Sequence, residues 1–259
     1  MDVSLTISIF LSMFVGLSAG YVGSLIVLKR MALVGDALSH VALPGLALGI
    51  LFNFNPLLGA FAFLFASAVL TWYIERAARL PTESIVGVLF VTALAIGILM
   101  IPQEGLLEAL FGNIEKITTL GAVLAMMTSI AIISIMRLIY NKLVLATISE
   151  ELAVSRGVNV AKVNLVYLLL VSIVVAVGVS VVGTLLVGAL VVMPAVAART
   201  ISPNLSKYAL LSSVFGLISA SAGVISASYT NLPAGPLAIL SGLMLFVACL
   251  AAKKFVIVR

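Results

Sequence analysis

The sequence has few charged residues, and this scarcity sets the class of protein. Only 9% of its 259 residues are charged, against 63% that are hydrophobic. A water-soluble domain covers its surface with polar side chains, so this composition excludes one. We therefore predict an all-α protein, a polytopic transmembrane helical bundle that forms one domain over residues 1–259. Its partner is the lipid bilayer, and we expect no nucleic acid despite the net charge of +5.

The sequence is also short of the residues that most enzymes use. It has no Gly-x-x-x-x-Gly-Lys-Ser/Thr phosphate loop, so we do not expect it to hydrolyse ATP by itself. Its single histidine argues against a catalytic zinc centre with several imidazoles. The lone cysteine, Cys249, cannot form an intrachain disulfide, which leaves the redox compartment open. We expect no enzymatic activity and no permanently bound cofactor.

The basic residues mark alternate connections between apolar segments. By the positive-inside rule those connections are cytoplasmic, which places the N-terminus and the acidic connection 102–118 outside. The C-terminus is then cytoplasmic if the chain crosses nine times. Only Lys116 falls outside this set, whose members are Lys29, Arg30, Arg76, Arg79, Arg137, Lys142, Arg156, Lys162, Arg199, Lys207, Lys253, Lys254 and Arg259.

The uncharged runs predict the membrane spans, because a helix needs about 20 apolar residues to cross ~30 Å of hydrocarbon. One run, 163–198, is too long for one straight crossing, and we expect it to turn at Gly183-Thr184 into a short return of about 15 residues. The total is eight or nine spans. A short interfacial helix is expected within 102–118. The other predicted spans are Val3–Leu28, Met31–Phe52, Leu57–Ile74, Ser84–Ile101, Thr119–Tyr140, Leu165–Val182, Tyr208–Ser228 and Pro236–Ala252.

The second span contains a carboxylate and the only histidine. Asp36 and His40 are four residues apart and therefore share one helix face. An ionisable group inside a membrane costs roughly 3 kcal/mol, which favours an ion or proton site over a pair that only fixes packing. Pro44 has no N–H, so it removes the helical donor to the His40 carbonyl, and Pro194 does the same for Leu190. We expect helix breaks near the pathway at both prolines.

The only sizeable polar stretch is Asn141–Asn164. Ser149 is a typical N-cap, Glu150 and Glu151 suit the positive end of a helix, and Gly157 suits its end. These residues predict a two-turn helix in a cytoplasmic loop. A helix this short needs packing to persist, so it either docks onto a partner or is an ordinary solvated loop helix. The residues alone favour neither.

The sequence resembles the ABC-3 family of permeases over nearly its whole length. The segment Gly35-Asp36-Ala37-Leu38-Ser39-His40, followed by Leu43-Pro44-Gly45, and the block Pro194–Arg199 are the specific landmarks. Val41 and Val196 depart from the usual alanines, but neither departure removes a ligand. Weaker landmarks follow in the family's order at Leu110-Phe111-Gly112, Glu151-Leu152-Ala153 with Gly157, Gly183–Val187 and Leu232–Gly235.

The resemblance implies the permease subunit of an ATP-driven importer of zinc, manganese or ferrous iron, with a type II ABC-importer-like fold. It implies a homodimer in a prokaryotic plasma membrane, bound to two cytoplasmic ATPases and served from outside by a metal-binding protein. It also implies that Asp36 and His40 lie on the metal pathway. The residues implied to contact the ATPase are Glu150, Glu151, Leu152, Ala153 and Gly157.

Two other classes compete with this interpretation. In a stand-alone proton-coupled carrier, Asp36 and His40 would form a proton relay. Such a carrier has no use for a docking helix, so the short polar helix favours the ATP-driven permease. An intramembrane enzyme fits least, because the spans hold no further polar cluster of catalytic type. The residues do not choose among the three metals, since a carboxylate and an imidazole suit all of them.

Overall fold

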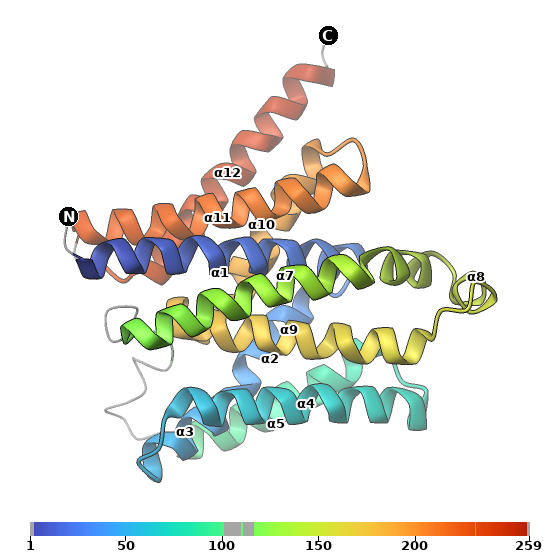
Figure 1. Cartoon of the computed structure of the whole chain (residues 1–259), viewed down its shortest axis with the longest axis horizontal. Helices are drawn as coiled ribbons and strands as arrows, with labels where there is room; N and C mark the ends of the chain where they lie inside the picture. The colour runs from blue at the N-terminus through green and yellow to red at the C-terminus, as the bar shows by residue number, and fades with distance from the viewer. Residues whose placement is uncertain (1–2, 101–109, 111–116, 231, 258–259) are drawn as a thin grey trace.

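The computed structural model describes residues 3–100, 110, 117–230 and 232–257, and this part of the chain is a bundle of helices without a strand (Figure 1). Most helices lie along the long axis of the molecule. They are α1 (Val3–Leu28), α2 (Ala32–Val41), α3 (Leu43–Leu51), α4 (Pro56–Ala78), α5 (Thr82–Met100), α7 (Thr119–Ile148), α8 (Glu150–Ser155), α9 (Val160–Val182), α10 (Val187–Ile201), α11 (Leu205–Thr230) and α12 (Ala234–Ile257).

Eight helical segments in the described residues are long and apolar enough to cross a membrane, with α2 and α3 counted as one. The remaining apolar segment, α10, has only 15 residues. It still joins both ends of the bundle. Its first residues follow Gly183, close to Gly235 at the beginning of α12, and Arg199 in its last turn donates to the Val27 carbonyl at the end of α1 (3.3 Å). The predicted short return is therefore confirmed.

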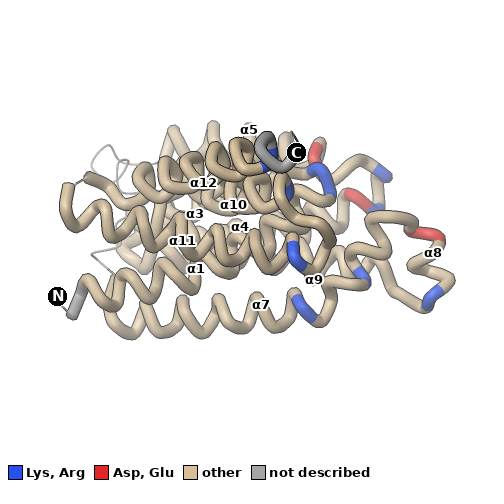
Figure 2. Tube along the Cα trace, turned by 90° about the horizontal axis from the view of Figure 1, so that it is seen from above, with Lys and Arg blue, Asp and Glu red and all other residues tan. Residues whose placement is uncertain are grey.

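Lys and Arg residues gather at one end of the bundle, together with α8 (Figure 2). We call this the basic end. It holds the end of α1, the α4–α5 connection and the beginning of α9. Lys29, Arg76 and Arg79 line one groove there with Glu150 of α8, and the same segments also contain Arg30, Arg156 and Lys162.

Burial separates the central helices from the outer ones. In the most apolar window of α1, 72% of the residues are buried, whereas the figure for α5 and α7 is 22%. The outer helices expose large aliphatic side chains, among them Leu99 on α5 and Leu138 on α7. In water such a surface would be unstable, but against lipid tails it is favourable. The composition and the surface therefore agree on a membrane environment.

Small residues let the central helices approach one another closely. A Cβ atom built on Gly16 of α1 would lie 2.3 Å from the Gly216 carbonyl oxygen on α11. One turn further, the Ser212 hydroxyl donates to the Gly20 carbonyl of α1. Membrane helices have no hydrophobic driving force between them, so close packing and such hydrogen bonds hold them together. The contact between α1 and α11 follows this rule.

Several predicted boundaries are wrong. Helix α7 continues to Ile148 instead of ending at Tyr140, and α9 begins at Val160, so the polar stretch is mostly helical. Arg137 consequently lies inside α7 and not in a connection. The gain of backbone hydrogen bonds explains these extensions, because polar residues continue a helix once it leaves the membrane. The interfacial helix expected within 102–118 falls mostly outside the described residues.

Candidate functional site

Helix α2 carries both polar residues of the predicted site. Asp36 is exposed on the surface of the single chain, and His40 one turn later is half-buried. The imidazole ring lies 5.3 Å from the Phe90 ring of α5, measured between ring centres. The buried Nδ1 atom of His40 has no hydrogen-bond partner among the residues that the structure describes. A buried nitrogen without a partner is costly, so this side chain fits a role toward a group from outside the chain.

The Asp36 carboxylate is likewise without a hydrogen-bond donor among the residues that the structure describes. Ser39 lies one helical turn after Asp36, but its hydroxyl donates to the Asp36 backbone carbonyl (2.6 Å) and is fully buried. Ser39 therefore stabilises the helix and does not add a ligand. The surface around Asp36 is apolar, with Leu33 80% exposed one turn earlier.

A close backbone contact fixes the position of Asp36. Helix α10 packs against α2 at this residue, and a Cβ atom built on Gly188 would lie only 2.5 Å from the Asp36 Cα. A side chain at position 188 would thus push the two helices apart. Gly35 of α2 faces Val192, which also belongs to α10. A Cβ atom built on Gly35 would lie 3.8 Å from the Val192 side chain, an ordinary contact distance. Gly188 was not identified as a site residue from the sequence, because nothing in the sequence distinguishes it from other glycines in membrane helices.

One carboxylate and one imidazole can bind a divalent transition metal only incompletely. No group of three or more His, Cys, Asp or Glu residues capable of holding a metal occurs in the described residues. Zinc usually takes four ligands, and manganese takes more, mostly oxygen. A single chain therefore supplies about half of a coordination shell, on a face that is open to a neighbour.

The two prolines of the predicted site behave differently. The second span is broken beside Pro44: α2 ends at Val41, and α3 begins at Leu43. The Ala42 amide donates to the Ser39 carbonyl (3.3 Å), and Pro44 has no N–H to donate to the His40 carbonyl. Pro194 lies inside α10, which continues to Ile201, so the break predicted there is wrong. Close packing of α10 against its neighbours keeps this helix continuous.

Helix α8 forms as the polar stretch predicts. The Ser149 side chain accepts from the Leu152 amide (3.2 Å), and Glu150 and Glu151 occupy the first turn, next to the positive end of the helix dipole. The helix ends at Ser155, and Gly157 two residues later has a φ of 74°, a backbone conformation that glycine adopts without strain. Each local signal thus has the structural role that its chemistry suggests.

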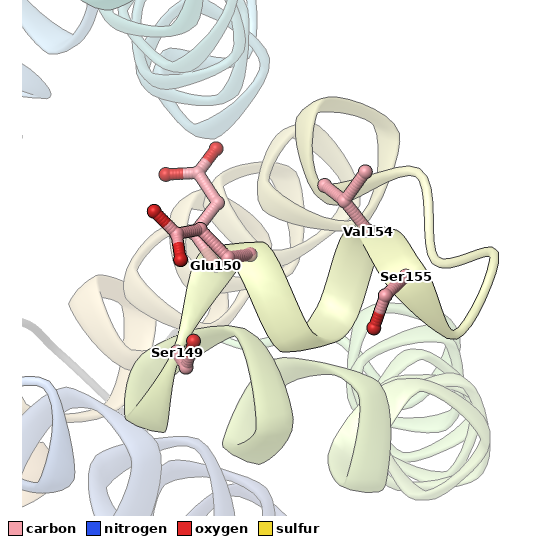
Figure 3. Close-up of a pocket in the computed structure, with 5 residues that line it drawn as sticks. Ser149, Glu150, Val154 and Ser155 are labelled. Atoms are coloured by element: carbon pink, nitrogen blue, oxygen red, sulfur yellow. The ribbon is translucent and has the colours of Figure 1, made fainter.

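The surface of α8 is open and partly apolar. Ala153 is fully buried and anchors the helix, whereas Leu152 and Val154 are exposed. Glu150 and Val154 project from the same side of the helix (Figure 3). Together with Ser149, Glu151 and Ser155 they line a shallow hollow. An exposed helix with both acidic and apolar side chains is suited to contact another protein.

A Gly-x-Ser-x-Gly pattern at Gly16–Gly20 has no catalytic role in this fold. A nucleophile elbow requires a sharp turn between a strand and a helix. Here the pattern lies in the middle of α1, and the buried Ser18 hydroxyl donates to the Val15 carbonyl (3.0 Å). The serine is therefore neither exposed nor strained.

These features define a class: a polytopic membrane protein with a polar pair inside its helices and a short exposed helix at its basic end. The sequence model of the ABC 3 transport family matches residues 1–253. The chain belongs to the ABC 3 transport family.

Relatives and a solved structure agree with this assignment. The chain is 30% identical over 248 residues to the manganese transport system membrane protein MntC of Listeria monocytogenes, which covers 94% of this chain and 89% of that protein. It is 26% identical to the high-affinity zinc uptake system membrane protein ZnuB of Buchnera aphidicola, over 88% of this chain and 90% of the relative. A chain in the structure of PsaBC from Streptococcus pneumoniae in complex with Fab superposes with a TM-score of 0.84 at 28% identity, covering 96% of this chain and 91% of the other.

Proposed function

We propose that this chain is the permease subunit of an ATP-driven importer of divalent transition metal ions, folded as one domain over residues 1–259. The observation that carries the proposal is the pair Asp36 and His40 on α2. In the described part of the chain, the carboxylate has no hydrogen-bond donor and the Nδ1 atom has no partner. A divalent cation supplies what both groups lack, since it neutralises the carboxylate and binds the imidazole. Relatives named as manganese and zinc transport proteins support the choice of substrate.

Two copies of the chain are proposed to share one metal site. The Asp36 carboxylate is exposed on an apolar face, where contact with lipid would cost roughly 3 kcal/mol or more. A two-fold axis near α2 would cover this face and double the ligand set to two carboxylates and two imidazoles. Without a cation the two carboxylates repel each other, and a divalent ion removes that repulsion. The metal is a transported substrate in this arrangement and not a permanent cofactor.

The ligand chemistry admits zinc, manganese and ferrous iron. Imidazole nitrogen binds all three, and carboxylate oxygen favours manganese slightly, so selectivity depends on the geometry of the assembled site. The relatives named above are manganese and zinc transport proteins, which makes these two ions the first to test. Such a site admits an ion yet lacks the thiolates that would retain it, which suits passage.

The energy is proposed to come from a separate ATPase subunit that binds α8. The sequence has no phosphate loop, so we do not expect the permease itself to hydrolyse ATP. The residues proposed to contact the ATPase lie on α8 and directly after it: Glu150, Glu151, Leu152, Ala153 and Gly157. Ala153 is buried, so its role is to seat α8 on the bundle. A metal-binding protein on the outer side completes the proposed system.

The proposed orientation places the basic end in the cytoplasm of a prokaryotic cell, with the N-terminus outside. Single cysteines test this in a variant in which Ser replaces Cys249. Pro203→Cys lies at the basic end, and Phe54→Cys lies in the turn between α3 and α4 at the opposite end. An impermeant thiol reagent should label only the cysteine at position 54 in intact cells. Strong labelling at position 203 would overturn the orientation.

Uptake into vesicles tests the function itself. The permease is reconstituted with the ATPase encoded beside it, and manganese, zinc and ferrous iron are offered separately. ATP-dependent accumulation of at least one ion supports the proposal. The alternative is a stand-alone proton-coupled carrier, in which Asp36 and His40 relay protons. Uptake by the permease alone, driven by a pH gradient and indifferent to ATP, would establish that alternative instead.

A further inference from the structure

A network of polar side chains joins four helices at the basic end. The Lys29 ammonium donates to the Asn164 side-chain oxygen (2.8 Å), and the Asn164 amide nitrogen donates to the Glu75 carboxylate (2.8 Å). The other Glu75 oxygen accepts from the Thr82 hydroxyl (2.7 Å). We call these four residues the inner clasp. They come from the end of α1, the beginning of α9, the end of α4 and the beginning of α5.

The chemistry of the inner clasp makes each member depend on the others. Asn164 presents its oxygen to a cation and its nitrogen to an anion, so its amide bridges two opposite charges. Burial lowers the pKa of the Lys29 ammonium, and the nearby Glu75 carboxylate opposes this shift. The ammonium also lies 4.5 Å from the centre of the Tyr167 ring. Removing one member would leave another partly buried charge without a partner.

A second contact strengthens the junction between α4 and α9. The Trp72 indole N–H donates to the Ala161 carbonyl (2.8 Å), and the Arg76 guanidinium lies 5.3 Å from the centre of the Trp72 ring. Trp72 thus binds the backbone of α9 three residues before Asn164. The two contacts hold the same pair of helices from adjacent turns.

The inner clasp lies between α8 and the helix that carries Asp36. Three of its members, Lys29, Glu75 and Asn164, line a groove of about 820 Å³ at the basic end, and Glu150 of α8 lines the same groove. Helix α8 leads into α9 through residues 156–159, and Asn164 follows five residues later. On the other side, Lys29 precedes α2 by only two residues, one of which, Arg30, has a positive φ of 62° in a tight turn. A movement of α8 therefore reaches α2 through few bonds.

We propose that Lys29, Asn164 and Glu75 are positioning residues that transmit the movement of α8 to α2 during transport. This inference rests on the proposed function, because it assumes that α8 binds the ATPase and that Asp36 binds the metal. When the ATPase moves α8 and the start of α9, the Asn164 amide moves with them and pulls Lys29. Lys29 in turn displaces the turn that precedes α2. Glu75 and Thr82 connect α4 and α5 to the same movement.

Charge reversal and its compensation test the inner clasp. Lys29→Glu and Glu75→Lys each place like charges on both sides of Asn164, and the combined variant restores one charge of each sign. The Asn164 side-chain amide can rotate by about 180°, so that in the double variant Lys29→Glu/Glu75→Lys its nitrogen donates to the carboxylate introduced at position 29 and its oxygen accepts from the ammonium introduced at position 75. The control is Lys162→Glu, the same charge change on an exposed residue of the first turn of α9. Uptake, ATP hydrolysis and manganese binding are measured on the reconstituted complex with the ATPase.

Each single reversal should lower uptake about tenfold or more, since a hydrogen bond to a charged group is lost. ATP hydrolysis and manganese binding should stay within about twofold of the unaltered complex, a split that a misfolded permease would not show. The double variant should recover most of the uptake, and Lys162→Glu should change little. If a reversal fails to insert, Asn164→Leu removes both hydrogen bonds without adding charge and must show the same split.

Three results would overturn the inference: single variants that transport normally, a double variant no better than either single one, or losses in which binding and hydrolysis fall together with uptake. Failure of the proposed function would give a different experimental result from failure of this inference. In that case the unaltered complex itself would show no ATP-dependent metal uptake, whatever the state of the inner clasp.

Discussion

Helices α2 and α8 differ in how their polar groups are satisfied. In α8, Ser149 caps the first turn, Glu150 and Glu151 lie at the positive end of the dipole, and Gly157 closes the last turn. In α2, the Asp36 carboxylate has no donor among the described residues, and the buried Nδ1 of His40 has no partner. The polar groups of α8 are satisfied within the chain, whereas two polar side chains of α2 are left without partners among the described residues.

This difference indicates what each helix needs from outside the chain. Polar groups without partners inside a membrane are retained where they bind something, and we have proposed that α2 binds a metal ion together with the ligands of a second copy. Helix α8 needs no ion, but six residues are too few for a stable isolated helix, and its exposed Leu152 and Val154 offer an apolar surface. The proposed function assigns it a protein partner, the ATPase. Changes in α2 should therefore affect metal binding, and changes in α8 should affect coupling.

The largest expected effect comes from removing the charge on α2. Asp36→Asn keeps the shape of the side chain but cannot neutralise a divalent ion, so uptake should fall by about 100-fold or more. His40→Ala should have a similar effect. Both variants should still assemble with the ATPase, which co-purification measures. The matched control is Glu83→Gln, the same change on an exposed carboxylate of α5. Normal transport by Asp36→Asn would remove this residue from the pathway.

The next effect comes from the contact that positions Asp36. Gly188→Ala places a methyl group 2.5 Å from the Asp36 Cα, so α2 and α10 must separate. Displacement of a ligand by about 1 Å costs roughly tenfold to 100-fold in a positioned site, and we expect uptake to fall about tenfold. Gly87→Ala is the control, because nothing lies within 4 Å of its added methyl group. Equal activity of the two variants would show that Gly188 has no positioning role.

Changes in α8 should uncouple ATP hydrolysis from uptake without affecting metal binding. Proline cannot adopt the positive φ of Gly157, and Gly157→Pro also removes the amide that donates to the Val154 carbonyl (2.9 Å). Glu151→Lys places a cation at the positive end of the helix. Either variant should lower the ratio of ions imported to ATP hydrolysed severalfold. Glu151→Gln should have a smaller effect, and unchanged ratios in all three would exclude a coupling role.

The smallest expected effect is the loss of the cap. Ser149→Ala removes the acceptor of the Leu152 amide, which costs about 1 kcal/mol of helix stability. Uptake should decrease only about twofold to fivefold, because docking onto the ATPase can restore the helix. Ser149→Asp should retain full activity, since aspartate caps equally well. Ser155→Ala is the control, as this hydroxyl donates back to the Leu152 carbonyl at the other end of α8.

Local signals were sufficient to predict much of this fold from the sequence. The charge pattern and apolar runs predicted the spans, and the turn expected at Gly183 occurs there, with a φ of 82°. Ser149 and Gly157 predicted α8 because capping depends on residues only a few positions apart. Asp36 and His40 were identified because ionisable residues are rare inside membrane helices.

Contacts between distant segments left no such signal. The Lys29–Asn164 bond joins residues 135 positions apart, and the role of Gly188 becomes visible only when α10 lies against Asp36. The break predicted at Pro194 failed for the same reason, because the packing around α10 outweighs the local preference of proline. Sequence periodicity describes one helix at a time and cannot specify which helices meet.

The number of manganese ions bound per permease chain tests the central claim most directly. The purified complex with the ATPase, held in the resting state without nucleotide, is equilibrated with manganese and analysed for metal and protein together. A site shared by two copies of Asp36 and His40 predicts one tightly bound ion for every two permease chains, and none after Asp36→Asn. One ion for every chain, or the same stoichiometry in the Asp36→Asn complex, would contradict the shared site.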